Sequence, residues 1–195
     1  MTYGENKKIT LSLIEEYAPN MAQLTEDEDI ARRLPFLYDA ACKELAQTKK
    51  IIATKMYSEI NDENKEDRYT AYSLPSDLYQ IKNIFAQTSE NKQINVDYYL
   101  VNNKIYINDN TPGNTVLEYY KYPQDINEET EDDFYLELDT DAQAFLPYKV
   151  ADDILKVDPS ADYTAFATEY QRKLQMLDTR KIIPSVTLKE PDFDI

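Results

Sequence analysis

Histidine is absent from this 195-residue sequence, and glycine occurs only at Gly4 and Gly113. Histidine is the residue most often used for proton transfer near neutral pH and the commonest metal ligand, so its absence excludes serine–histidine and cysteine–histidine catalysis. Two isolated glycines cannot build a glycine-rich phosphate loop or a dinucleotide-binding fingerprint. Kinases, nucleotidases and Rossmann-type enzymes are therefore excluded together. We expect no catalytic residues, no metal site and no cofactor.

Cysteine is nearly absent too, because Cys42 is the only one in the chain. One cysteine cannot form a disulfide or a cysteine zinc site within a single chain. It lies inside an apolar helical pattern, which predicts a small buried hydrophobic residue rather than a reactive thiol. The lack of a disulfide framework predicts synthesis in the cytoplasm.

Long apolar runs are missing as well. No stretch approaches the ~18 consecutive apolar residues that a membrane-spanning helix needs, and residues 1–8 are mostly polar. We therefore expect a soluble chain with no signal peptide and no contact with a membrane.

Basic residues are in short supply, with 21 Lys and Arg against 37 Asp and Glu, for a formal net charge of −16. Proteins bind nucleic acids tightly by neutralising phosphates with clustered Lys and Arg, and the sequence contains no such cluster. The composition argues against tight binding to DNA or RNA. A channel lined with carboxylates could still let DNA pass without sticking, because like charges repel.

Carboxylates are plentiful, and three segments could in principle hydrolyse glycosides or hold magnesium: residues 62–67, residues 128–133 and the pair Asp152-Asp153. A calcium loop beginning at Asp62 fails, because Asp67 stands where glycine is required and Ser73 where the closing glutamate should be. The run of acidic residues at 128–133 is typical of a solvated loop whose charges repel one another. Asp152-Asp153 is predicted to lie on the solvated face of a helix. A carboxylate-dependent hydrolase therefore remains a minor alternative.

Helical periodicity occurs at both ends of the chain. Residues 10–17 predict a short amphipathic helix, and a longer one begins after Thr25, which forms a capping-box pattern with Glu28. Pro35 should kink or restart this longer helix. Its apolar positions are Ile30, Leu34, Leu37, Ala41, Leu45 and Ile52.

Two further helices are predicted after residue 138. The first has caps at residues 139–141, Pro147 in an early turn and a buried stripe of Val150, Ala151, Ile154 and Leu155. The last helix opens at Ser160. One face of it carries Tyr163, Phe166, Tyr170, Leu174 and Leu177.

Between the helical segments, short runs rich in Ile, Val and Tyr alternate with turn signals, which predicts an antiparallel β unit. Asn102-Asn103 suits a tight hairpin, since asparagine tolerates positive φ. The expected strands include residues 81–85, 94–101, 104–107 and 115–122.

These elements predict one α+β domain over residues 1–195. The N- and C-terminal helices would form a helical bundle as the base (residues 9–60 and 141–180), with an inserted antiparallel β unit at about 69–138. Residues 181–195 would form an extended C-terminal arm, because Pro184 and Pro191 prevent a helix there.

Tyrosine is the most unusual feature, with 17 residues. In the pairs Tyr98-Tyr99 and Tyr119-Tyr120, strand alternation should turn one ring toward the core and the other outward. An outward row of tyrosines suits protein binding, because the ring is large and amphipathic with few rotamers to freeze. These four residues are candidate interface aromatics, although ordinary sheet packing explains part of the pattern.

The arm also predicts binding, because Ile182, Ile183, Val186 and Leu188 are apolar in a segment too short to bury its own side chains. We expect these four residues to anchor it on a neighbouring subunit or another protein. Adding a strand to a sheet edge is the favoured mode.

Residues 72–78 (YSLPSDL), followed by Ile81 and Ile84, residues 116–123 (VLEYYKYP) and residues 146–151 (LPYKVA) occur in a familiar order. Over residues 24–177 this order resembles the head-to-tail adaptor, or connector, proteins of tailed bacteriophages. The resemblance implies a helical bundle with an inserted β region, assembled as a dodecameric ring under the portal. DNA passes through such a ring, and a C-terminal segment, here residues 174–195, often contacts the portal.

The resemblance therefore implies a structural virion protein of the neck, assembled in the host cytoplasm and partnered by copies of itself, the portal protein and tail or other neck proteins. The alternatives are another neck or tail-completion (stopper) protein, the hydrolase considered above, and a monomeric interaction module. If the ring interpretation holds, large apolar side chains should be exposed on one subunit, over more than the roughly 1,000 Å² expected of a specific contact.

Overall fold

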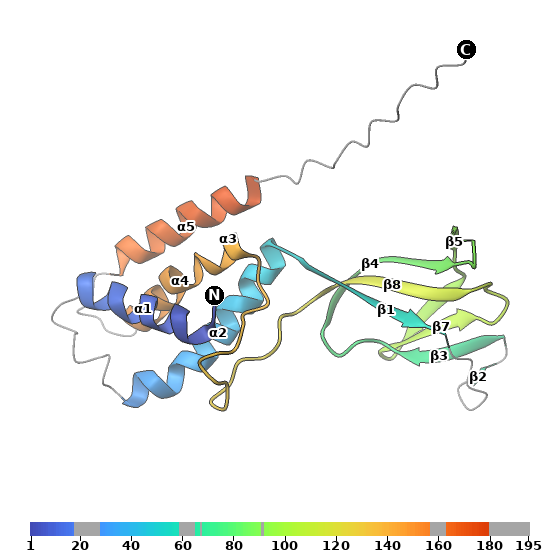
Figure 1. Cartoon of the computed structure of the whole chain (residues 1–195), viewed down its shortest axis with the longest axis horizontal. Helices are drawn as coiled ribbons and strands as arrows, with labels where there is room; N and C mark the ends of the chain where they lie inside the picture. The colour runs from blue at the N-terminus through green and yellow to red at the C-terminus, as the bar shows by residue number, and fades with distance from the viewer. Residues whose placement is uncertain (18–27, 59–64, 67, 91, 157–162, 180–195) are drawn as a thin grey trace, which may run out of the picture.

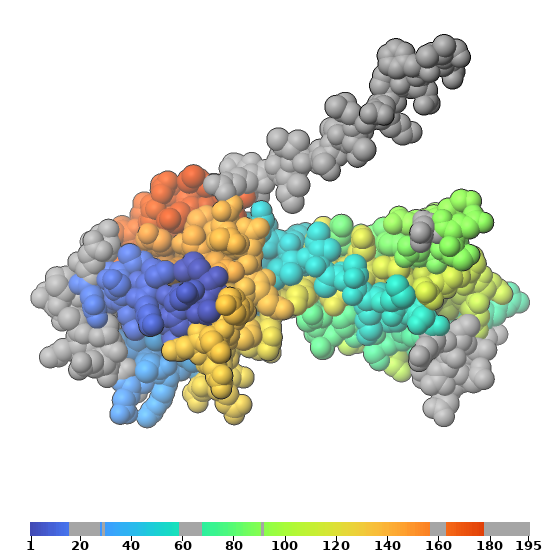
Figure 2. All heavy atoms as spheres, in the orientation of Figure 1, coloured from blue at the N-terminus to red at the C-terminus, as the bar shows by residue number. Residues whose placement is uncertain are grey.

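The computed structural model describes residues 1–17, 28–58, 65–66, 68–90, 92–156 and 163–179. Helices gather at one end of the molecule and two antiparallel sheets at the other, so the predicted α+β class is confirmed (Figure 1). The molecule narrows where β1 (Ile51–Tyr57) and β8 (Asn114–Lys121) connect the helical part to the β unit (Figure 2).

Helix α1 (Tyr3–Tyr17) begins seven residues before the predicted start at Thr10. A capping box fixes its start: the Thr2 N–H donates to Glu5 Oε2 at 2.8 Å, and the Glu5 N–H donates to Thr2 Oγ1 at 3.2 Å. The Tyr3 N–H also donates to the Phe134 carbonyl at 2.8 Å. The other predicted capping residue, Thr25, lies outside the described residues.

Helix α2 (Glu28–Thr48) runs through Pro35 as one helix and buries the predicted stripe around Ile30, Leu34 and Leu45. The prediction that the helical base extends to residue 60 is wrong, because residues 51–57 form strand β1. Ile51 and Ile52 are β-branched, and all seven residues of β1 pair with β8. Ile52 therefore does not continue the helical stripe.

Three helices follow the β unit: α3 (Thr140–Gln143), α4 (Leu146–Leu155) and α5 (Thr164–Thr179). Asp139 caps α3 by accepting a hydrogen bond from the Asp141 N–H, and Pro147 lies in the first turn of α4, as predicted. Helix α4 contacts α1, α2 and α5, so it lies at the centre of the helical core. The predicted start of the last helix at Ser160 lies outside the described residues.

The segment after β8 corrects the predicted end of the β insertion. Residues 122–138 form no strand that joins either sheet; they return to the helices instead. Ile126, Leu136 and Leu138 are buried in the helical core, and Thr2 forms a β-bridge with Tyr135. Apolar residues at these positions therefore complete the helical core.

The β unit is a sandwich of two four-stranded antiparallel sheets. The first sheet has the order β1-β8-β4-β5, and the second has the order β2-β3-β7-β6. The bounds of the remaining strands are β2 Lys65–Glu66, β3 Tyr69–Ser73, β4 Leu78–Gln87, β5 Gln93–Asn95, β6 Tyr98–Val101 and β7 Lys104–Asn108.

Two details of the sandwich bear on the predictions. The predicted strand 94–101 is two strands in different sheets, because residues 96–97 cross from β5 to β6. The predicted Asn102-Asn103 hairpin is confirmed, and both residues have positive φ, 48° and 61°. Asparagine tolerates this conformation better than most residues.

The small sandwich core joins the inner faces of the sheets, with Leu117 and Tyr119 from the first sheet and Ile105 and Ile107 from the second. The rings of Tyr57 on β1 and Tyr72 on β3 lie 4.9 Å apart, so β1 lies beside β3. The short link between β5 and β6 places those two strands together. Strands β1 and β6 are therefore on opposite sides of the sandwich.

Candidate functional site

Strand β6 exposes all four of its residues at the end of the second sheet. Tyr98 pairs with the buried Ile107 and Tyr99 with Tyr106, so the two rings face opposite sides of the sheet as predicted, but both are 39% exposed and neither is buried in the core. They remain exposed because β6 is the end strand of its sheet and lies beyond the small sandwich core. Leu100 and Val101, which the sequence did not single out, are exposed beside them.

Tyr99 belongs to a row of rings on the outer face of the second sheet. It stacks on Tyr106 at a centroid distance of 4.6 Å and meets Tyr69 edge-on at 5.0 Å. The Tyr69 hydroxyl donates to Asp97 at 2.8 Å, and this hydrogen bond raises the pKa of Tyr69. Packing of one ring on the next holds the row rigid, which lowers the entropy cost of using it as a contact surface.

The other tyrosine pair follows strand alternation. Tyr119 is buried in the sandwich core, and its hydroxyl donates to Asp77 at 3.1 Å. Tyr120 faces outward and is partly covered, because the Lys50 ammonium lies 4.5 Å from its ring centroid. The structure therefore separates the four predicted aromatics. Tyr119 lies in the core, Tyr120 lies on the outer face of β8, and Tyr98 and Tyr99 lie on the end strand β6.

Strand β1 carries a second exposed apolar surface. Ile52 and Met56 are each 56% exposed and lie on the same side of the strand as Thr54. Their partners across β8 are Tyr120 and Val116. Both residues fall within the range predicted to be helical, although the alternation of Ile52, Thr54 and Met56 is a strand signal.

The acidic pair on α4 is less exposed than predicted. Asp152 is only 3% exposed, so its assignment to a solvated face is wrong. It accepts a hydrogen bond from the Lys156 ammonium, and this bond raises the pKa of Lys156. Asp153 pairs with Lys149 at 2.7 Å. Asp152 is buried because α4 packs against helices on three sides, and the lysine four residues later could have signalled the pair.

The ion-pair network extends to α2 and α5. Glu44 lies 3.6 Å from Lys149 and accepts a hydrogen bond from the Tyr170 hydroxyl at 2.8 Å. Burial, followed by this hydrogen bond, raises the pKa of Tyr170. These ion pairs and hydrogen bonds link α2, α4 and α5 to one another.

The other acidic segments add no metal centre to the described part of the chain. Asp132 pairs with Lys7, and its carbonyl accepts from the Gly4 N–H at 2.9 Å. Among the described residues, no group of three or more acidic or cysteine side chains could hold a metal ion. The candidates Asp62 and Asp67 lie outside the described residues. Cys42 is buried, which raises its pKa to about 12.

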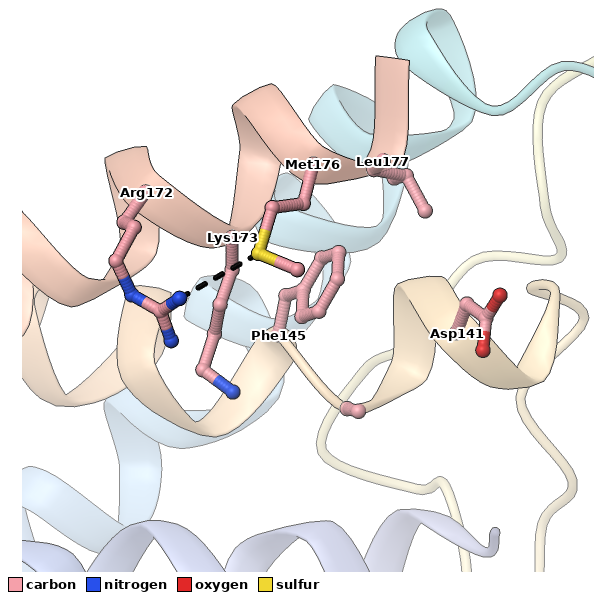
Figure 3. A pocket seen from close by; sticks show the side chains of 7 residues that line it. Asp141, Phe145, Arg172, Lys173, Met176 and Leu177 are labelled. Atoms are coloured by element: carbon pink, nitrogen blue, oxygen red, sulfur yellow. Dashed lines mark hydrogen bonds between the residues drawn. The ribbon is translucent and has the colours of Figure 1, made fainter. Parts of the chain in front are cut away.

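A cavity of about 150 Å³ lies between α5 and the α3–α4 turn (Figure 3). Phe145, Met176 and Leu177 supply apolar walls, while Arg172 and Lys173 bring positive charge. The Arg172 guanidinium donates to Met176 Sδ at 3.4 Å. Asp141 adds a carboxylate to the lining, so the cavity combines apolar walls with charges of both signs.

The predicted anchors Ile182, Ile183, Val186 and Leu188 lie outside the described residues. Within the described helices, none is long and apolar enough to cross a membrane. In comparisons with known proteins, no protein-family model matches the chain, and no curated protein is significantly similar to it.

Proposed function

We propose that this chain is a structural subunit that assembles with copies of itself, as the head-to-tail adaptor ring in the neck of a tailed bacteriophage. In this role it joins the portal to the tail, and its ring continues the channel through which DNA passes without specific binding. The helical part serves as a bundle formed from both ends of the chain, and the β unit is inserted into it.

One observation carries the proposal: apolar side chains are exposed on β1 and on β6, at opposite sides of the same sandwich. A contact between two different surfaces of identical copies is heterologous, and it closes into a ring when the rotation between copies permits. Surfaces on opposite sides of a rigid unit suit this head-to-tail contact. A two-fold dimer would instead use one surface twice.

The charge of the chain agrees with a DNA channel. A net charge of −16 repels phosphates, so a ring of such subunits would neither bind DNA tightly nor slow its passage. The same ring features would suit a tail-completion or stopper protein. The two roles differ in their neighbours, since an adaptor binds the portal directly.

The test is a mass measurement by light scattering on purified protein, alone and mixed with portal rings. We expect a discrete ring, either alone or on the portal. Replacing Tyr98 and Leu100 with serine should reduce the assembled fraction, because both side chains are exposed at the β6 surface.

Tyr135→Ser is the matched control, since this aromatic is more exposed than any other large apolar residue described but lies outside the sandwich. It should leave assembly unchanged. A chain that stays monomeric in both conditions, or that loses assembly only with the control variant, contradicts the proposal.

A further inference from the structure

The outer edge of β1 has no partner strand among the described residues. Strand β1 ends the order of the first sheet, so in the described part of the chain only the edge facing β8 is paired. Backbone N–H and C=O groups of a strand point to both edges. No described backbone group bonds to the outer edge of residues 51–57. A strand edge that lacks a partner is a template for another strand, and β1 is seven residues long.

The side chains near this edge determine which kind of extended segment could bind to it. Ile52 and Met56 offer apolar contacts on the outer face of the sheet. Lys49, Lys50 and Lys55 bring positive charge to this edge, where their ammonium groups contact Asp139, Gln80 and the Ser73 carbonyl. The edge therefore favours an extended segment that is apolar on alternate positions and negatively charged nearby.

Residues 185–190 of this chain, Ser-Val-Thr-Leu-Lys-Glu, have this pattern. Val186 and Leu188 alternate with polar residues, as in a strand with one apolar face. Prolines at 184 and 191 bound the segment, so all six residues between them retain the N–H that strand pairing needs. Glu190, Asp192 and Asp194 supply negative charge that complements the three lysines.

Length and reach also agree. Six residues of strand span about 20 Å, close to the roughly 23 Å of the seven-residue β1. The segment starts six residues after the end of α5. Figure 1 shows the described end of α5 at the same side of the helical part from which β1 emerges.

We propose that residues 185–190 bind the outer edge of β1 as an added strand, with Val186 and Leu188 on the same face of the sheet as Ile52, Thr54 and Met56 and opposite two of these three positions. Main-chain hydrogen bonds supply the affinity, and the alternate apolar side chains fix the register. Only the source of the segment rests on the proposed function, because in a ring it comes from the neighbouring copy and ties the two subunits together.

Disulfide trapping tests the proposal on the full chain. Val186→Cys is combined in turn with Ile52→Cys, Thr54→Cys and Met56→Cys, three positions on one side of β1. Oxidation should give a strong disulfide for at least one pair, because directly opposed residues of paired strands have Cβ atoms about 5 Å apart. The native Cys42 is buried, so the single Val186→Cys variant should give little product.

The matched control pairs Val186→Cys with Tyr135→Cys, an exposed position outside the sandwich. Failure to trap any β1 pair, or equal trapping at Tyr135, overturns the inference. A ladder of linked chains supports it with the neighbouring copy as donor. A product within one chain supports the added strand but removes it as a link between subunits.

Amide exchange gives an independent readout of the hydrogen bonds. Deleting residues 181–195 should remove protection from alternate amides of β1 and leave β8 protected, whether or not the ring still forms. Unchanged exchange in β1 would overturn the added strand. Because ring mass is measured separately, failure of this inference is distinguishable from failure of the proposed function.

Discussion

The helical part and the β unit of this chain bury apolar residues in cores of different size. Helices from both ends bury one large core around α4, joined by the segment 122–138. The sandwich buries a much smaller core and leaves Ile52, Met56, Leu100, Val101 and three tyrosines exposed. The larger core implies that the helical part supplies most of the stability, while exposed apolar residues on the β unit are what the proposed assembly would cover.

The largest effect is expected from a cavity in the helical core. Leu146→Ala removes a fully buried side chain from the helical core and should cost about 2–5 kcal/mol in the free energy of unfolding. Urea unfolding followed by circular dichroism measures this cost. A loss below about 1 kcal/mol would show that the core around α4 is not the main source of stability.

Alkaline pH should weaken the same core through its tyrosines. Burial raises the pKa values of Tyr3, Tyr38 and Tyr170 in the helical part, and that of Tyr57 in the sandwich to about 12. Each folded-state pKa exceeds the unfolded value of about 10, so the stabilisation is complete below pH 10 and declines as pH rises above it.

The measurement is a titration of tyrosinate absorbance beside circular dichroism. We expect part of the tyrosine to ionise only as the helical signal disappears. Complete ionisation of all tyrosines before any loss of helix would contradict the burial of these rings.

A smaller effect is expected at the β6–β7 hairpin. Asn103 has a φ of 61°, so Asn103→Val should cost about 1–2 kcal/mol or more, because a β-branched residue fits this conformation poorly. Asn103→Gly is the control and should be nearly neutral. Thermal unfolding measures both variants, and equal melting temperatures for the two would contradict the hairpin geometry.

The smallest effect on stability is expected at the exposed strand β6. Leu100→Ser changes an exposed side chain, so the free energy of unfolding should shift by no more than about 0.5 kcal/mol. The assembled fraction should nevertheless fall, since the same side chain lies on the proposed contact surface. A large loss of stability with unchanged assembly would reverse the roles assigned to the two regions.

Local signals predicted much of the helical part. The stripe in α2 and the stripe Val150, Ala151, Ile154 and Leu155 in α4 are both buried, and Pro147 lies where a first turn accepts it. Hydrophobic periodicity is a local property, so it can be recognised without knowing which segments pack together. The Asn102-Asn103 turn was predictable for the same reason.

Strand β1 shows where local signals end. Ile52 lies seven residues after Leu45, so it matches a helical stripe as well as a strand. Neither glycine nor proline separates α2 from β1. What decides the conformation is pairing with β8, where the partner of Ile52 is Tyr120, 68 residues later, and no local pattern contains that partner.

The exposure of candidate site residues depends on the same distant contacts. Both Tyr98 and Tyr99 are exposed because β6 ends its sheet, and strand order cannot be deduced from alternation within a strand. Asp152 is buried because three helices surround α4. In each case the local conformation was predictable, but the surroundings of the side chain were not.

The central position of α4 also has a consequence for synthesis. Helices α1 and α2 leave the ribosome first, but their main partner α4 begins at Leu146. Roughly 90–100 residues separate the end of α2 from α4, so at about 5–20 residues per second the early helices wait several seconds or longer. During that interval the apolar stripe of α2 lacks its final cover, and the nascent chain is a natural client for chaperones.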